Sequence, residues 1–483
     1  MKMVKSLLLG GTAGLLAVAG AQAADLPVKA RAVQYVKICS LYGAGFYYIP
    51  GTDTCIKVGG WVRTYTTYGT NGNSTNGGLV ANVNNRSTNN FEWRVRGYVT
   101  VDAREQTEYG TVRGYLAVGT NTEYAGGTNG FPGGTGAASF NSNRGFIQWA
   151  GFTAGVAQSF FDFYSGPATS YYGGKINPSE DTGDGGLMVW GYTAQFGGGL
   201  SATLSAEAPR TQGVWHNTIA LDGTGIGAAT SGSGGLNAPD VVANLRIDQA
   251  WGSAQVMGAL HEVNGTYYGA GATPLDTTGG PDNKVGWAVG AGIKLNAPMI
   301  GRGDYLQAEV NYSEGAVGYI NAGNNARYAK YNSDTDYGTG LLFDGIYGGA
   351  GSDIQLTTAW GVNAAYEHFW SPEWRTSVYG GYQAFSQNAT GTALVCTAEG
   401  VAAAACGGSA GNWNYWNIGS RTQWNVTKNF YLGVDVVYQH LDTMFSDTAV
   451  TIPGSGGRPT YTGVLSNQDN WAVNFRVHRD FYP

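Results

Sequence analysis

Long apolar runs and charged residues are both scarce in this chain of 483 residues. After residue 23, no uninterrupted apolar stretch reaches the roughly 18 residues that a membrane-spanning helix needs, so the mature chain offers no such helix. Charged residues make up only 12% of the sequence, and the formal net charge is -6. This acidic balance argues against a nucleic-acid partner and mildly favours cations over anions near the protein.

Cysteine is also rare, with four residues that fall as two local pairs, Cys39 with Cys55 and Cys396 with Cys406. In an oxidising compartment such pairs most simply form two disulfides, although four cysteines allow three connectivities. Neither pair has CxxC spacing and none of the five histidines lies beside them, so a zinc site is not expected.

The N-terminus has the features of a secretory signal at residues 1–23. Lys2 and Lys5 form its basic region, residues 7–19 its apolar region, and residues 21–23 (AQA) its cleavage site. An uncleaved anchor is disfavoured because the apolar run is short. We therefore expect export, a periplasmic segment at residues 24–54, and one large domain at residues 55–483.

What the chain has in abundance is glycine and aromatic residues: 78 glycines, and 13% Phe, Trp and Tyr together. With few methionines, this composition favours many strands joined by polar turns over a helical bundle. The mean hydropathy of -0.18 suits a water-soluble protein. It equally suits a membrane barrel, in which only alternate residues face lipid.

Alternation of apolar and polar residues recurs in segment after segment, most clearly at residues 91–102. One face there carries Phe91, Trp93, Val95, Val99 and Val101, and the other carries Glu92, Arg94, Arg96, Tyr98, Thr100 and Asp102. This period of two predicts strands. It does not by itself separate a membrane barrel from a soluble sandwich, which alternates too.

The lengths of the connectors favour the barrel. Short ones at residues 103–109, 195–199, 249–252, 296–303, 369–373 and 426–429 alternate with long polar ones at residues 69–88, 119–143, 160–186, 209–240, 263–284, 315–353, 386–414 and 442–470. Such alternation predicts an all-β, transmembrane antiparallel β-barrel of about sixteen strands, with short periplasmic turns and long extracellular loops.

The third long connector, residues 160–186, concentrates aromatic and acidic side chains, and we expect it to fold into the barrel and narrow the bore. Its acids are Asp162, Glu180, Asp181 and Asp184, with Lys175 as its one base. The facing wall is expected to carry Arg63, Arg94, Arg96 and Arg113, since Arg on a lipid face costs roughly 2–4 kcal/mol at the membrane midplane. Opposed charges of this kind would set ion selectivity. The alternative is that the loop acids are solvated and the arginines pair with Glu92 and Asp102.

Weaker signals have simpler explanations. Aromatic residues near strand ends, such as Trp374 and Trp424, fit interfacial girdles better than a sugar-stacking slide in the lumen. The acids of the sixth long connector lack the spacing of a calcium loop. His261 has no nucleophile and orienting acid in a hydrolase arrangement that the sequence reveals. We expect no catalytic activity, no metal and no cofactor.

Several motifs resemble the general porins of alphaproteobacteria, the rhizobial and brucella type. They are CSLYGAGFYYIPGTDTCIKVGGWVR at residues 39–63, ADLP at residues 24–27, FEWRVRGYVTVDAR at residues 91–104 and RVHRDF at residues 476–481. The resemblance covers essentially the whole mature chain. It implies a sixteen-stranded outer-membrane barrel, a homotrimer, and passive diffusion of small hydrophilic solutes and ions past an inward third loop.

The leading interpretation is thus a weakly cation-preferring general porin in contact with outer-membrane lipid. A substrate-specific channel for sugars or anions is the nearest alternative. A secreted, soluble, lectin-like β protein is the competitor from another class, and an enzyme built in a barrel around His261 is the third.

Overall fold

The computed structural model describes residues 37–69, 91–125, 139–163, 169–172, 185–216, 232–268, 278–321, 327–331, 337–399, 401, 406–408, 410–452 and 461–483. The expected signal at residues 1–23 and the first part of the expected periplasmic segment lie outside these residues. Within the described part of the chain, no helix is long and apolar enough to cross a membrane.

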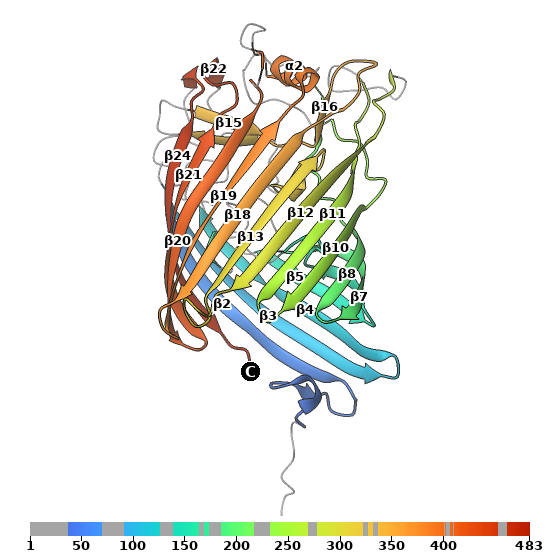
Figure 1. Ribbon diagram of the computed structural model, residues 1–483, viewed down its shortest axis with the longest axis vertical. Coiled ribbons are helices and arrows are strands. Elements are labelled where there is room, and N and C mark those ends of the chain that lie inside the picture. The colour runs from blue at the N-terminus through green and yellow to red at the C-terminus, as the bar shows by residue number, and fades with distance from the viewer. Residues whose placement is uncertain are drawn as a thin grey trace, which may run out of the picture.

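The main sheet is a closed antiparallel barrel (Figure 1). Sixteen strands follow one another around the ring in chain order, and the last pairs with the first, so this ring has no free edge. The strands are β2 (Cys55–Gly69), β3 (Phe91–Thr107), β4 (Gly110–Ala125), β5 (Ser139–Trp149), β6 (Phe152–Ala157), β7 (Leu187–Gly197), β8 (Leu200–Glu207), β10 (Asp240–Gln249), β11 (Gly252–Val263), β12 (Lys284–Asn296), β13 (Tyr305–Glu314), β18 (Thr358–Phe369), β19 (Trp374–Ser386), β20 (Trp413–Thr427), β21 (Phe430–Asp442) and β24 (Gln468–Asp480). The predicted fold is confirmed.

Some of the predicted connector boundaries are wrong. β4 continues to Ala125 and β5 begins at Ser139, both inside the connector expected at residues 119–143. The connector expected at residues 103–109 is a two-residue turn, because β3 continues to Thr107 and pairs with Gly110 at the start of β4. The hydrogen-bonded pairing of these two strands extends further along the chain than the apolar alternation from which the boundary was predicted.

Apolar side chains cover the outside of the barrel. On β3, Trp93 is 56% exposed and Val95 is 44% exposed, whereas their neighbour Glu92 is 1% exposed. The inner positions of the last strands are polar and buried, as at Asn417, Gln439 and Asn474. An apolar outer band around a polar interior is the pattern of a barrel whose solvent is lipid.

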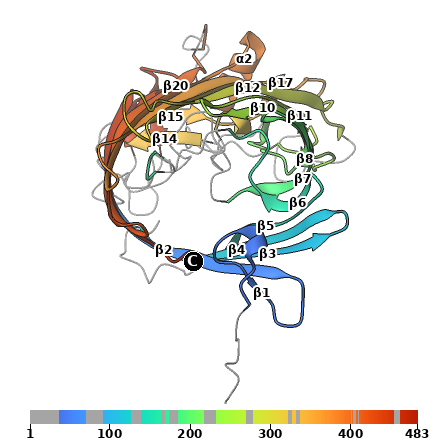
Figure 2. The ribbon, with the colours of Figure 1, turned by 60° about the horizontal axis from the view of Figure 1, so that its bottom comes forward.

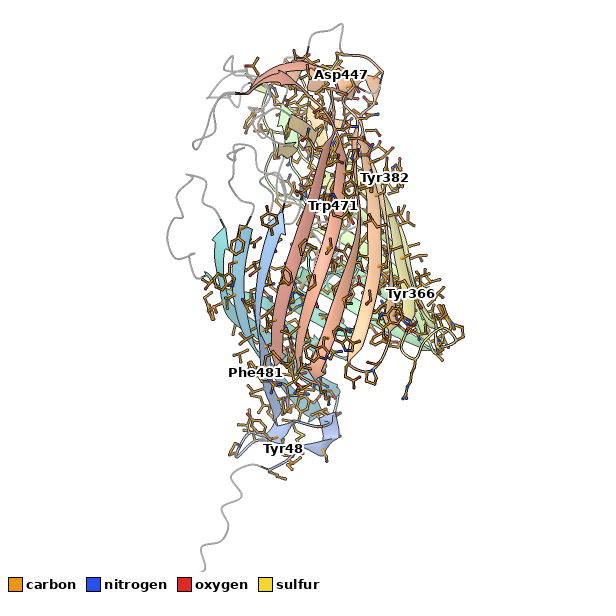
Figure 3. The ribbon with its side chains drawn as sticks, turned by 90° about the vertical axis from the view of Figure 1, so that its left-hand side faces the viewer. Tyr48, Tyr366, Tyr382, Asp447, Trp471 and Phe481 are labelled. Carbon is orange, nitrogen blue, oxygen red and sulfur yellow. A yellow bond between two sulfur atoms is a disulfide. The ribbon has the colours of Figure 1, made fainter. Side chains whose placement is uncertain are left out.

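Aromatic side chains gather on the outer wall near both strand ends. Trp374 and Trp424 stack with ring centroids 5.6 Å apart near the short turns. Figure 3 shows Trp471 and Tyr382 higher on the wall and Tyr366 lower. These positions favour girdles, but Trp413 is buried on the inner side and stacks on Phe385 beneath the loops.

Two disulfides join the cysteines as local pairs. Cys39–Cys55 holds the N-terminal segment, with η1 (Ser40–Tyr42) and the two-residue β1 (Tyr47–Tyr48), against the start of β2. Cys396–Cys406 closes a short loop after α2 (Ala389–Ala398). Of the three connectivities open to the sequence, the structure has the local one.

The sixth long loop also folds inward. It contains η5 (Val317–Tyr319), β14 (Arg327–Tyr331), β15 (Tyr337–Leu341), β16 (Gly345–Tyr347) and β17 (Gln355–Leu356). Figure 2 shows β14 and β15 within the ring of barrel strands. Leu342, Phe343 and Ile346 are buried in an apolar core that reaches Trp413 and Met444. Two smaller pieces complete the loop end: β9 (Val214–His216), which pairs with β16, and a hairpin of β22 (Ala449–Ile452) and β23 (Tyr461–Val464).

Candidate pore constriction

The third long loop crosses the lumen from one wall to the other. It leaves β6 beside β10 and β11, where Asn244 Nδ2 donates to the carbonyl oxygen of Phe160 at 2.6 Å. Its Thr169–Tyr172 portion lies against strands on the far side of the ring, where the carbonyl oxygen of Thr169 accepts from the Ser377 hydroxyl on β19. The prediction that this loop folds into the lumen is confirmed.

The far end of the loop is held by Asp435 on β21. The Asp435 carboxylate accepts from the Tyr171 N–H at 2.5 Å and from the Ser170 hydroxyl at 3.2 Å. Tyr379 on β19 donates to the same carboxylate at 2.7 Å. A Cβ atom at Gly433 would lie 1.8 Å from the Tyr171 hydroxyl, so any larger residue here would require Tyr171 to shift.

The near end of the loop is held by an ion pair. Asp162 Oδ1 lies 2.5 Å from Arg210 Nη2, and the Arg210 guanidinium stands 4.6 Å from the centroid of the Tyr319 ring. Burial alone would lower the pKa of Arg210, but Asp162 raises the pKa above its ordinary value, so Arg210 stays charged. Asp162, predicted to line the pore, has a side chain that is 0% exposed and fastens the loop to the wall.

Four arginines form a ladder on the inner wall of β24, β2 and β3. Arg63 and Arg96 are register partners, and Tyr65 pairs with Arg94 on one side and with Arg476 on the other. Arg94 Nη1 donates to the Tyr65 hydroxyl at 2.6 Å. We call Arg63, Arg94, Arg96 and Arg476 the arginine ladder.

The ladder touches the inward loop. Arg476 Nη2 donates to the carbonyl oxygen of Tyr171 at 2.7 Å, and its guanidinium stands 4.1 Å from the centroid of the Tyr171 ring. Arg63 lies 4.4 Å from the centroid of Trp61, which stacks on Tyr98. The arginines are therefore held by rings on a fixed wall, with the loop beside them.

Arg113 does not belong to the ladder. Its guanidinium forms two hydrogen bonds to Asp102, at 3.1 and 2.9 Å, and Arg104 shares the same carboxylate. Asp102 lies six residues beyond Arg96 on β3, roughly 20 Å away at about 3.3 Å per residue. For Arg113, pairing with Asp102, the alternative weighed from the sequence, is what the structure shows.

The remaining loop acids, Glu180, Asp181 and Asp184, lie outside the described residues, as does Lys175. Sequence reasoning did not include Arg476 in the site. Arg476 alternates with the apolar Phe475 and Val477, which indicates the polar face of its strand, and ring closure sets that strand beside β2.

His261 is part of a buried polar cluster. Its Nδ1 lies 2.7 Å from Asp240 Oδ1, and its Nε2 lies 3.5 Å from Asp344 Oδ2. Asp344, from the sixth loop, accepts from the backbone N–H groups of Val317 and Gln212. Among the described residues, no three or more His, Cys, Asp or Glu side chains are grouped so as to hold a metal ion.

A family model for the porin subfamily matches residues 25–473. The chain belongs to this family. It is 34% identical over 258 residues to the Omp2b porins of Brucella suis and Brucella abortus, which is 52% of this chain and 64% of theirs. The aligned part thus spans less than two thirds of these relatives' length. Family membership confirms the resemblance found in the motifs, and with the barrel it supports an outer-membrane location.

Solved porins are similar to this chain only at a low level. An anion-selective porin from Comamonas acidovorans is 11% identical, with a TM-score of 0.43, and the match covers 89% of this chain and 100% of that one. OprB from Pseudomonas putida is 9% identical, with a TM-score of 0.46, over 88% of this chain and 94% of its own. Nothing about the function of this porin follows from similarities this low.

Proposed function

We propose that the chain is a passive outer-membrane porin for small hydrophilic solutes and ions, without catalytic activity. Its narrowest part lies between the arginine ladder and the inward third loop. The contact between Tyr171 and Arg476 carries this proposal, because it sets the loop directly beside the basic wall. Charged groups on both sides of such a gap would act on every passing ion.

The basic side consists of Arg63, Arg94, Arg96 and Arg476. Arg113 lies below them, where it shares the Asp102 carboxylate with Arg104. We assign the acidic side to Glu180, Asp181 and Asp184 of the loop, and Asp162 to the role of anchor. A weak cation preference would follow from these three acids and from the net charge of -6.

Planar-bilayer recording tests this assignment. In a salt gradient the wild type is expected to show a reversal potential of the sign for cations. An Asp181→Asn, Asp184→Asn variant should lose that preference, whereas unchanged selectivity would remove both acids from the constriction. Conductance should rise in proportion to salt concentration, as in an open water-filled pore.

A substrate-specific channel for anions is the second candidate, favoured by the four arginines on one wall. It predicts a reversal potential of opposite sign, and conductance that saturates with one anionic solute.

We further propose a signal peptide at residues 1–23, a periplasmic segment at residues 24–54 and a barrel at residues 55–483 that assembles as a homotrimer. N-terminal sequencing of the protein from outer membranes should begin at Ala24. Analytical ultracentrifugation in detergent should give the mass of three chains. A mature chain that still begins at Met1, or a monomer, would contradict these assignments.

A further inference from the structure

The outer wall carries a pocket that the pore does not use. It has a volume of about 610 Å³ and lies where the upper ends of β18, β19, β20 and β21 meet the seventh and eighth loops. This volume falls within the roughly 300–1,000 Å³ of typical small-molecule sites. Trp360 shows on which face of the barrel the pocket lies. Its side chain is 41% exposed on the outer face, whereas the preceding residue, Ala359, is fully buried on the inner face. The pocket therefore opens to the outside of the barrel.

The strand register explains the hollow. Trp360, Ala384, Asn414 and Asp442 are successive register partners and form one row across four strands. Ala384 has the smallest of these side chains and lies between Trp360 and Asn414, so it leaves a hollow in the outer surface of the sheet. Gly407 and Ser446, from the seventh and eighth loops, border the opening above.

The lining combines aromatic rings with hydrogen-bonding groups. Trp360 and Tyr382 lie with ring centroids 5.1 Å apart. On the polar side, Asp442 Oδ1 accepts from Asn467 Nδ2 at 2.5 Å and lies 3.0 Å from His440 Nε2. Within the described part of the chain, Asp442 Oδ2 has no hydrogen bond, and the side chain is 38% exposed. Rings beside carboxylate and amide groups suit a ligand with apolar faces and a rim of hydroxyls.

The charge of the pocket narrows the choice of ligand. Among the described residues that line it there is no lysine or arginine, and Asp442 stands one row above His440 and Asp469. These carboxylates would repel a phosphate. His440 lies between Asp442 and Asp469 and bonds to both, and no group of three or more His, Cys, Asp or Glu side chains in the described part of the chain is placed to hold a metal ion. An uncharged, hydroxylated ligand remains.

The position of the pocket points to the membrane surface. Trp416 and Tyr438 lie on the same outer face below it, and Figure 3 shows Tyr382 and Trp471 on the upper part of the wall. Trp and Tyr mark the level of the headgroups in a membrane. With the outer-membrane orientation proposed above, the pocket stands at the headgroup level of the outer leaflet.

We propose that this pocket binds a saccharide, with a sugar ring against Trp360 and Tyr382 and its hydroxyls donating to Asp442. The sugar could be part of a membrane glycolipid or a free saccharide, and the same chemistry serves both. Ala384→Trp would fill the pocket from its floor. Ala364→Trp, on the same outer face of β18 but nearer the middle of the wall, is the matched control.

The test uses the full-length barrel in lauryldimethylamine oxide, a detergent without a sugar. Dodecyl maltoside is added, and native mass spectrometry counts the molecules that stay bound; equilibrium dialysis measures binding of free maltose. The wild type and Ala364→Trp should retain dodecyl maltoside, and Ala384→Trp should lose it. Asp442→Asn should bind about tenfold more weakly, because a charged acceptor becomes a neutral one.

Binding of dodecyl maltoside alone would assign the site to a lipid-linked saccharide, and binding of maltose as well would extend it to free sugars. No retention by the wild type, or equal retention by Ala384→Trp and Ala364→Trp, would overturn the proposal. Trp360→Ala gives the same test if the bulky variant does not fold. Bilayer conductance of the same preparations reports separately on the proposed pore function.

Discussion

Asp162 and Arg210 form an ion pair in which the two side chains are 0% and 2% exposed. The pair joins the third loop to the segment that follows β8. Arg210 also stands over Tyr319 of the sixth loop, and the Tyr319 hydroxyl donates to Asp240 on β10 at 2.7 Å. The third, fourth and sixth long loops and strand β10 thus meet around one buried ion pair. These contacts fix the start of the third loop to the barrel.

Removing one partner of this pair should destabilise the barrel. Arg210→Met leaves the Asp162 carboxylate buried without its cation, and loss of one member of a buried pair typically costs about 3–5 kcal/mol. The double variant Asp162→Leu, Arg210→Met should recover most of that loss, because no buried charge remains. Urea unfolding in detergent micelles, followed by tryptophan fluorescence, measures the difference. Equal destabilisation of the single and double variants would contradict the ion-pair interpretation.

Gly433→Ala should displace the far end of the third loop. The added Cβ would lie 1.8 Å from the Tyr171 hydroxyl, so Tyr171 must move away from β21. Single-channel conductance is expected to change, with more current noise from the loosened loop. Gly114→Ala on β4 is the control, because nothing lies within 4 Å of a Cβ there. The same conductance in both variants would mean that the loop adapts without moving.

The barrel could be predicted because its signal is local. Alternation along each strand and the lengths of the connectors need no knowledge of the three-dimensional structure. The inward sixth loop was not predicted, although the apolar run Leu341, Leu342, Phe343 interrupts its polar sequence. That run fills the core beneath Trp413, and such an excess of apolar residues in a long loop is a usable signal of an inward fold.

Which residues lie at the constriction depends on the register of the strands and on the path of the loops. The sequence alone shows neither. Arg113 lies on the polar face of its strand, as predicted, but the register of β3 and β4 brings it to Asp102. Asp162 finds its partner 48 residues away at Arg210, across two strands. The alternation around Arg476 indicates its polar face, but only the closure of the barrel brings it beside Tyr65.

Acid should weaken the structure through Asp304, in the turn between β12 and β13. Burial alone would raise the pKa of Asp304, but Tyr366, the Phe369 N–H and His368 lower it below its ordinary 3.8. A carboxylate with a lowered pKa stabilises the fold above its unfolded pKa, and this contribution is lost as pH falls through the folded pKa. Asp304→Asn should therefore lower the urea midpoint at about pH 6 and reduce its further fall toward about pH 3. Asp53→Asn, on an exposed turn, should behave like the wild type. An unchanged acid dependence in Asp304→Asn would contradict this role.

Neutralising the arginine ladder should shift ion selectivity toward cations, whereas neutralising Arg113 should not. Arg96 lies between Trp61 and Tyr98 on the inner wall, at 5.8 and 5.5 Å from their ring centroids, and its charge acts on ions in the lumen. Arg113 shares the Asp102 carboxylate with Arg104 near the short turns, roughly 20 Å from Arg96, which is beyond the screening length of about 8 Å at physiological salt, so its field at the ladder is weak. Arg96→Gln should raise the ratio of potassium to chloride permeability severalfold, as measured from reversal potentials in a potassium chloride gradient, and Arg113→Gln should change it little. The shift should shrink in concentrated salt, because screening shortens to about 3 Å at 1 M. A larger effect of Arg113→Gln than of Arg96→Gln would move the selective region from the ladder to the short-turn end of the barrel.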